Sequence, residues 1–161
     1  MGILQGLILA VILSLLGLIA HAKNPTIAIL GKVVDENAFH NLKNYPEAET
    51  YPGLLIFRFD EQLFFANAPN FRDAIRAALA ADPSVRRVLI DAEAINDIDI
   101  TGLDTLAELK DELAHSNIEL CFARVKTQIR EIIRRAGLEE QIGADRFYPT
   151  IQSGIDAYLA G

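Results

Sequence analysis

The sequence predicts an α/β fold: a mixed, mostly parallel β-sheet flanked by α-helices and preceded by one N-terminal transmembrane helix. Three observations support this prediction. An uncharged apolar run opens the chain, short apolar segments alternate with amphipathic helical segments from residue 54 onward, and roughly 140 residues follow the run, enough for one domain with a sizeable core. Strands separated by helices of about ten or more residues need crossover connections, which make neighbouring strands parallel.

The apolar run covers residues 2–20 and contains only Gln5 and Ser14 as polar side chains. A helix rises about 1.5 Å per residue and the bilayer core is about 30 Å thick, so a helix over residues 2–21 is close to the length that spans it. A removed signal peptide is the alternative, because residues 20–22 have the small-x-small pattern of a cleavage site. No Lys or Arg precedes the run, which favours the retained transmembrane helix.

Basic residues flank this run on one side only. Lys23 and Lys32 follow it, and the positive-inside tendency therefore places the C-terminal side in the cytoplasm. The sequence predicts a protein of the inner (cytoplasmic) membrane, with lipid around its helix and its folded domain in the cytoplasm.

Composition indicates which partners the chain can bind and in which redox compartment it lies. The formal net charge is -7 and the isoelectric point is about 4.9, so the positive surface that binds phosphate backbones is missing and nucleic acid is not an expected partner. Cys121 is the only cysteine and lies in an apolar stretch. We expect it to be buried as a small apolar side chain, which suits a reducing compartment.

Residues 22–52 are predicted to be a linker between the transmembrane helix and a domain that covers residues 53–161. Residues 26–31 form an apolar stretch that favours a short strand after the Asn-Pro break at residues 24–25. Residues 32–52 have no strand or helix periodicity and contain several Asn, His and Pro residues, which is typical of a linker or lid on the surface.

The domain is expected to begin with a β-hairpin, which makes the sheet mixed. Residues 54–59 have the strongest strand pattern, residues 60–61 form the turn, and residues 63–66 are the predicted antiparallel partner. Asn67 is expected to cap a helix that has Pro69 in its first turn and ends before residue 82.

Strands and helices then alternate to the end of the chain. The strands are predicted over residues 87–91, 118–123 and 146–148, and the helices over residues 102–115, 127–136 and 138–142 and after a cap at Thr150. Gly137 is expected in the left-handed conformation that ends a helix. In such a sheet, chemistry is expected in the loops beyond the carboxyl ends of the strands.

The loop after residues 87–91 gathers carboxylates around one hydroxyl, Thr101, at the start of a helix. Three hypotheses remain open. In the first, Asp99 or Thr101 caps the helix and the acids interact favourably with its positive end. In the second, Thr101 is a phosphoacceptor, and repulsion between its phosphate and the carboxylates makes phosphorylation a disruptive switch. In the third, the acids hold a metal ion, although nothing fixes their geometry and no metal site is predicted. The carboxylates are Glu93, Asp97, Asp99 and Asp104.

The sequence Asp-Ile-Thr-Gly-Leu over residues 99–103 resembles the Asp-Ser-Ser-Gly-Leu signature of STAS domains. This STAS-like fold occurs in bacterial anti-sigma factor antagonists and in the cytoplasmic tails of SulP anion transporters. The resemblance implies that Thr101 stands where the antagonists carry their phosphorylated serine, within a switch loop that contains Asp97, Asp99, Gly102, Leu103 and Asp104. Asp104 replaces the usual Gly of the antagonists, which counts against regulation by an antagonist-type kinase.

Three other stretches resemble the SulP (sulfate permease) branch of this family. Residues 26–33 are similar to the linker after the last transmembrane segment, residues 45–49 and 52–59 to the entry into the tail domain, and residues 63–68 to a Phe-Ala-Asn-Ala motif. Together they cover most of the chain. They imply the C-terminal part of a SulP transporter: the last transmembrane helix and the cytoplasmic STAS domain.

The resemblance implies a regulatory and assembly role. SulP proteins move sulfate, bicarbonate or dicarboxylates through a bundle of many helices, and one helix cannot build that site. The implied partners are the transmembrane transport domain of the same or a neighbouring polypeptide, a second STAS domain in a homodimer, and membrane lipid. The alternative is a membrane-tethered signalling protein, like an anti-sigma factor antagonist, that is switched by phosphorylation at Thr101.

No catalytic residues and no cofactor are predicted. His21, His40 and His115 lie far apart, without partners at the spacing of a metal site or a nucleophile, so the chain is not expected to be an enzyme. Arg130 and Arg134 are one helical turn apart and could contact a nucleotide, an acidic partner or lipid headgroups; a solvated helix face is the alternative.

Overall fold

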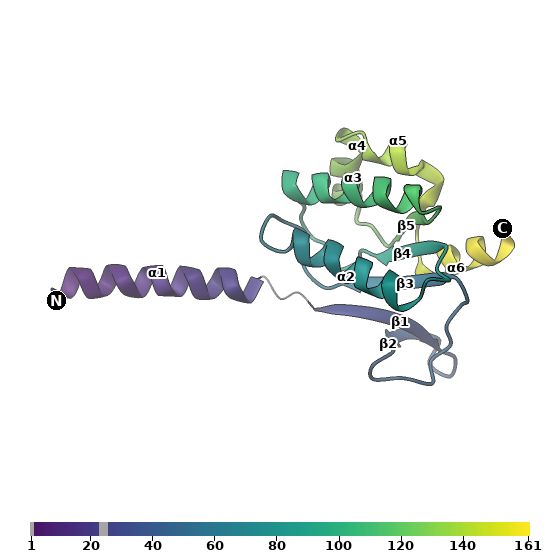
Figure 1. The fold of residues 1–161 in the computed structure, drawn as a ribbon, viewed down its shortest axis with the longest axis horizontal. Helices are drawn as coiled ribbons and strands as arrows, with labels where there is room; N and C mark the ends of the chain where they lie inside the picture. Colours follow the sequence, from purple (N-terminus) through teal and green to yellow (C-terminus); the bar gives the residue numbers. More distant parts are fainter. Residues whose placement is uncertain (1, 23–25) are drawn as a thin grey trace.

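The computed structural model describes residues 2–22 and 26–161, and these form one long helix followed by an α/β domain (Figure 1). The strands are β1 (Ile27–Val33), β2 (Ala38–Asn41), β3 (Leu54–Phe59), β4 (Arg87–Asp91), β5 (Glu119–Ala123) and β6 (Phe147–Tyr148). The helices are α1 (Ile3–Ala22), α2 (Ala68–Ala81), α3 (Ile100–His115), α4 (Thr127–Arg135), α5 (Leu138–Ile142) and α6 (Ile151–Ala160), with a 3-10 turn at Ala144–Arg146.

The strands form a single mixed sheet in the order β2-β1-β3-β4-β5-β6. The strands from β3 to β6 are parallel, and β1 is antiparallel to both of its neighbours. The mixed, mostly parallel sheet predicted from the alternation of segments is confirmed. Gly137 has a left-handed φ of 74°, and the Thr150 hydroxyl caps α6 by accepting from the Ser153 N–H at 3.0 Å, both as predicted.

Helices cover both faces of the sheet, which is why the middle residues of its central strands are apolar on both faces, with the charged residues near the strand ends. On one face, side chains such as Phe57, Val88 and Phe122 pack against α2, α3, α4 and α5. On the other face, Ile56 and Leu89 belong to a second core cluster that α6 completes. The period of two residues along each strand divides these side chains between the two layers.

The predicted hairpin partner of β3 is wrong. Residues 63–66 form no strand with β3; Leu63 makes only an isolated parallel bridge with Ile98, and β1 is the antiparallel neighbour of β3. The cause is Asn67, whose side-chain oxygen accepts from the Phe64 N–H at 3.0 Å and whose amide donates to the Gln62 carbonyl at 2.8 Å. These two hydrogen bonds fold residues 62–67 into a compact turn that leads into α2.

The irregular structure predicted after residue 32 is also corrected. β1 continues to Val33, the chain reverses through Asn37 at a φ of 49°, and β2 adds an edge strand to the sheet. Lys32 and Glu49 then exchange two backbone hydrogen bonds, of 2.9 Å and 2.8 Å. Part of the predicted linker over residues 22–52 is therefore built into the sheet, because backbone pairing there does not depend on strong side-chain periodicity.

α1 extends away from the domain (Figure 1). Its span Ile3–His21 has a mean hydropathy of 2.6 and is 0% buried, and it is long and apolar enough to cross a membrane. The described side chains of α1 are exposed. Exposure of this surface to water would be strongly unfavourable, so α1 is a candidate membrane-spanning helix.

α1 enters the domain at the edge of the sheet where the parallel strands end. Ile27 is paired with Phe59, the last residue of β3, and the Thr26 carbonyl accepts a hydrogen bond from the Asp60 N–H at 3.0 Å. Since β3, β4 and β5 are parallel, their carboxyl ends lie at this same edge. We call this end of the sheet, at which β3, β4 and β5 have their carboxyl ends, the carboxyl edge.

Candidate functional site

The loops that follow β3 and β4 meet at the carboxyl edge. Leu63 joins them through its backbone: its N–H donates to the Asp97 carbonyl at 3.0 Å, and its carbonyl accepts from the Asp99 N–H at 3.2 Å. The structure therefore brings the switch loop, residues 97–104, against residues 62–65 of the preceding connection.

Asp99 holds the switch loop with both carboxylate oxygens. Oδ1 accepts from the Gly102 N–H at 2.7 Å and caps α3, and Oδ2 accepts from the Phe65 N–H at 2.9 Å. The capping role considered for Asp99 is confirmed. The hydrogen bond from Phe65 to Asp99 was not predicted from the sequence, because the two residues are 34 positions apart.

Gly102 is required by a close approach of backbone to backbone. A Cβ at this position would lie 2.6 Å from the Leu63 carbonyl oxygen and 2.9 Å from Ile98 Cγ1. Leu103 follows it, half-buried against the main core. The Asp, Gly and Leu of the motif are thus accounted for by capping and packing.

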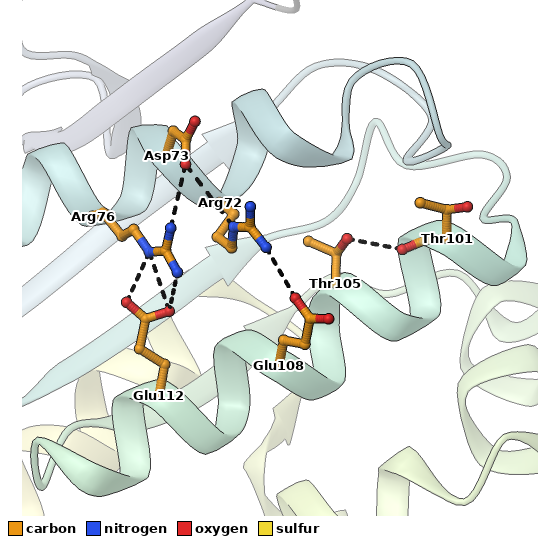
Figure 2. A network of polar contacts seen from close by, with 7 residues as sticks. All are labelled: Arg72, Asp73, Arg76, Thr101, Thr105, Glu108 and Glu112. Atoms are coloured by element: carbon orange, nitrogen blue, oxygen red, sulfur yellow. Dashed lines mark hydrogen bonds and ion pairs between the residues drawn. The ribbon is translucent and has the colours of Figure 1, made fainter.

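Thr101 is the member of the motif that the fold leaves open. Its side chain is exposed in the first turn of α3, and no described residue hydrogen bonds to its hydroxyl; only its carbonyl is engaged, by the Thr105 hydroxyl at 2.8 Å (Figure 2). Asp97 and Asp104 are exposed nearby along the chain. A phosphate on Thr101 would be accessible to solvent and close to carboxylates.

The arginines of α2 are already engaged by α3 (Figure 2). Arg72 contacts Glu108 at 2.9 Å, and Arg76 contacts Glu112 at 2.7 Å. Hydrogen bonding from Arg76 lowers the pKa of Glu112, and the same bond raises the pKa of Arg76. These pairs connect the outer flanks of the two helices and lie further along α3 than Thr101.

Arg130 and Arg134, one helical turn apart, both line a cavity of about 480 Å³ at the carboxyl edge. Arg130 contacts Glu139 at 2.7 Å and lies over the Phe147 ring, 4.9 Å from its centroid. Arg134 contacts Glu131 at 2.6 Å, and this bond raises the pKa of Arg134. An anion that enters the cavity has to compete with these carboxylates.

An ion pair between a buried carboxylate and a half-buried arginine lies beside this cavity and was missed from the sequence. Asp91 is fully buried, and Arg124 reaches it with two hydrogen bonds of 2.9 Å and 2.6 Å. Hydrogen bonding to Asp91 raises the pKa of Arg124, which also contacts the exposed Glu93 at 2.5 Å. The register of the parallel strands pairs Asp91 with Ala123. Arg124, the residue after Ala123, was therefore the feature of the sequence that could have indicated this ion pair.

The described residues hold no group of three or more His, Cys, Asp or Glu side chains that could bind a metal ion. His40 contacts Glu36 at 2.7 Å, and His115 lies 2.7 Å from the Asp111 carbonyl, on different parts of the domain. Cys121 is buried in β5, and burial raises the pKa of its thiol to about 11. The candidate functional surfaces are therefore the switch loop and the arginine-lined cavity.

A family model of the STAS domain matches residues 45–154. A probable sulfate transporter of Mycobacterium tuberculosis is 35% identical over 159 residues, which cover 98% of this chain and 28% of the transporter. The chain thus spans under a third of the length of this relative.

Solved structures show the same fold. The murine Slc26a9 anion transporter, in its inward-facing state, superposes with a TM-score of 0.87 at 22% identity, over 98% of this chain and 26% of the transporter. A SulP transporter STAS domain from Vibrio cholerae superposes with a TM-score of 0.60 at 19% identity, over 74% of this chain and 91% of that domain.

Proposed function

Because the chain belongs to the STAS domain family, we propose that it is the membrane-anchored, cytoplasmic regulatory part of a SulP-type anion transporter of the sulfate, bicarbonate or dicarboxylate class. In this proposal α1 lies in the inner membrane beside a transport domain supplied by the same or a neighbouring polypeptide. The domain acts in regulation and assembly. No enzymatic activity is part of the proposal, since the relative described above is a transporter.

The observation that carries the proposal is the exposed apolar surface of α1 next to a STAS domain. The span Ile3–His21 packs on nothing within the domain, and only residues 23–25 separate α1 from Thr26, next to β1. A helix of this kind is stable in lipid, where other helices can pack against it. The domain is then held at the membrane surface.

The domain would act by binding the conformations of the transport domain with different affinity. Any ligand or domain that prefers one of two states shifts the population towards that state. A regulatory tail of this kind needs no substrate site of its own, and one helix supplies none.

The test is to measure anion uptake with and without the domain. Radiolabelled sulfate, bicarbonate and a dicarboxylate are supplied to cells that carry the complete gene and to cells in which it stops after residue 52. We expect the uptake rate of at least one anion to change while the full chain, reconstituted alone in vesicles, transports none. Unchanged uptake of all three anions would contradict the proposal.

A second proposal concerns Thr101 as a phosphoacceptor in a membrane-tethered signalling protein. It is favoured by the exposed hydroxyl of Thr101, since Asp99 and Gly102 beside it have structural roles. Phosphate there would add negative charge next to Asp97 and Asp104. If this function is correct, a kinase-like partner purifies with the chain, Thr101→Ala alters that binding and Thr101→Asp abolishes it. Unchanged binding in both variants would contradict this function.

Arg130 and Arg134 are proposed contacts for a nucleotide, an acidic partner or lipid headgroups. Their support is the cavity that they share with Arg124, whose guanidinium is paired with Asp91. Nucleotide binding by the full chain in detergent is measured by equilibrium dialysis, and Arg130→Ala is expected to weaken it.

A homodimer through the domain is likewise proposed, with light scattering of the purified chain as its test.

A further inference from the structure

Two large apolar side chains are exposed at the carboxyl edge. Ile100 is 77% exposed and Phe65 is 63% exposed. The two loops that carry them are joined, because the Asp99 carboxylate, one residue before Ile100, accepts the Phe65 N–H at 2.9 Å. Outside α1, the only other exposed large apolar residues of the described chain are Val34 and Leu159. Exposed apolar side chains that gather at one place are typical of an interaction surface.

A hollow lies beside Phe65. A cavity of about 230 Å³ opens between the two loops, and its wall includes Phe65, Leu63 and Ile98 together with the carboxylates of Asp97 and Asp99. It offers an apolar floor with a negatively charged rim. The loops around it are fixed by the Leu63 and Asp99 hydrogen bonds, so the surface is formed in advance of binding.

Exposed carboxylates lie around this hollow, and the Lys126 ammonium contacts Asn96, the residue before Asp97. Glu61, Asp97 and Asp104 are exposed, and none of them forms a salt bridge within the part of the chain that the structure describes. Asp104 stands four positions after Ile100 on α3, so the two side chains lie on the same face of that helix. The surface therefore attracts a basic partner.

This surface is also close to the end of the membrane helix. Thr26 is hydrogen bonded to Asp60 at the carboxyl edge, and the chain from Ala22 to Thr26 can span at most about 14 Å. The carboxyl edge is thus the part of the domain that α1 holds near the membrane. A partner that reaches it has to lie at the cytoplasmic face of the membrane.

We infer that Phe65 and Ile100, with Glu61, Asp97 and Asp104, form a docking patch for a basic cytoplasmic loop of the transport domain beside α1; this inference rests on the proposed function. Cytoplasmic loops of membrane proteins carry an excess of Lys and Arg, which complements the carboxylates. Anionic headgroups of the inner leaflet are repelled by the same carboxylates. A symmetric contact with a second copy would set acid against acid.

The test is photo-crosslinking in the membranes of cells that produce the full chain. The photo-reactive amino acid benzoylphenylalanine replaces Phe65 or Ile100, and the crosslinked peptides are sequenced by mass spectrometry. We expect both probes to react with a Lys- or Arg-containing cytoplasmic loop of a polytopic membrane protein. The product is expected to fall as ionic strength rises, since exposed charges are screened.

Leu159 is the matched control position. It has the same exposed fraction as Phe65, 63%, and it lies at the opposite edge, because the neighbouring Tyr158 hydroxyl donates to the Pro52 carbonyl before β3 at 2.7 Å. Asp97→Lys is expected to reduce the product from the Ile100 probe several-fold. Glu140→Lys, an exposed charge reversal on α5, is expected to leave it unchanged.

Three results would overturn the docking patch: adducts with lipid only, adducts with a second copy of the chain, or no more product than the Leu159 probe gives. A probe at Leu13 of α1 separates this failure from failure of the proposed function. If Leu13 reacts with a transport domain and the two patch probes do not, the patch is wrong and the function stands. If neither position reacts with such a protein, the proposed function is wrong.

Discussion

Within the motif over residues 99–103, some residues are required by the fold and others are exposed without a structural role. Asp99 and Gly102 are required by contacts with Phe65 and Leu63, whereas Thr101 makes no side-chain contact that the fold needs. The sequence predicted the helix cap because a cap involves residues three positions apart. It could not predict the contacts to residues 63–65, which depend on how two distant loops meet.

Gly102→Ala is predicted to destabilise the domain by about 1 to 3 kcal/mol, the usual effect of forcing an extra carbon into a filled space. The added Cβ would lie 2.6 Å from the Leu63 carbonyl oxygen, so the backbone of one loop has to move. Thermal unfolding of the full chain in detergent, followed by circular dichroism, measures the change. Thr101→Ala, one residue away and exposed, is the control and is expected to stay within about 0.5 kcal/mol; similar losses in both variants would contradict this account.

Arg124→Ala is predicted to cost about 3 kcal/mol or more, because it leaves the carboxylate of Asp91 buried without its partner. Glu93 is the control, since it contacts the same guanidinium from a side chain that is 62% exposed. Glu93→Ala is therefore expected to cost less than about 1 kcal/mol. Urea unfolding of both variants measures the difference, and equal losses would show that Asp91 does not depend on Arg124.

At the scale of elements, local pattern was sufficient wherever a segment was long or bounded by clear signals. The apolar face of α2, the stop at Gly137 and the Thr150 cap come from residues within a few positions of one another. Residues 63–66 resemble a strand over a few apolar positions, and only the Asn67 hydrogen bonds turn them into a loop. β2 is defined by its backbone partner in β1, which no local pattern reveals.

β5 lies in the middle of the parallel strands, and Cys121 is buried between the sheet and α6. Burial raises the pKa of its thiol from 9.0 to about 11, with the Arg87 charge acting in the opposite direction. A pKa raised in the folded state gives stability that is complete below the unfolded pKa and is lost as pH rises through the folded one. We predict a loss of about 2 to 3 kcal/mol between about pH 9 and pH 11.

Chemical denaturation across that pH range measures the loss, and Cys121→Ala is the comparison. Ala does not titrate, so the variant is expected to lose less stability over the same interval even if its stability at neutral pH is lower. Parallel pH profiles for the two proteins would mean that the thiol does not contribute. Thiol-reactive reagents at neutral pH are expected to label Cys121 only after unfolding.

For the whole molecule, the arrangement of α1 and the domain decides where function can occur. α1 projects beyond the carboxyl edge (Figure 1). The switch loop, the docking patch and the arginine-lined cavity follow the carboxyl ends of the strands, so they lie at the end of the domain from which α1 leaves. A helix anchored in lipid would hold these three surfaces at one face of the membrane. The opposite edge, with Leu159, would face the cytoplasm.

At this scale we predict that the protein stays in the membrane pellet after alkaline carbonate extraction and keeps residues 2–22. The apolar span of α1 has no other place to be buried. A C-terminal tag is expected to resist protease added outside spheroplasts and to be degraded once the cells are opened. Release of the chain by carbonate, or a mature form that begins after residue 22, would favour the removed signal peptide.

The sequence by itself determined the class of fold, most of its elements and the apolar helix, because these depend on periodicity, caps and composition within short stretches of chain. Tertiary structure alone decided which strand pairs with β3, that the Asp91 carboxylate is paired with Arg124, and that Asp99 is hydrogen bonded to Phe65. These features arise from contacts between residues about thirty positions apart or more. Their energies depend on burial and on the register of neighbouring strands, and no local pattern carries that information.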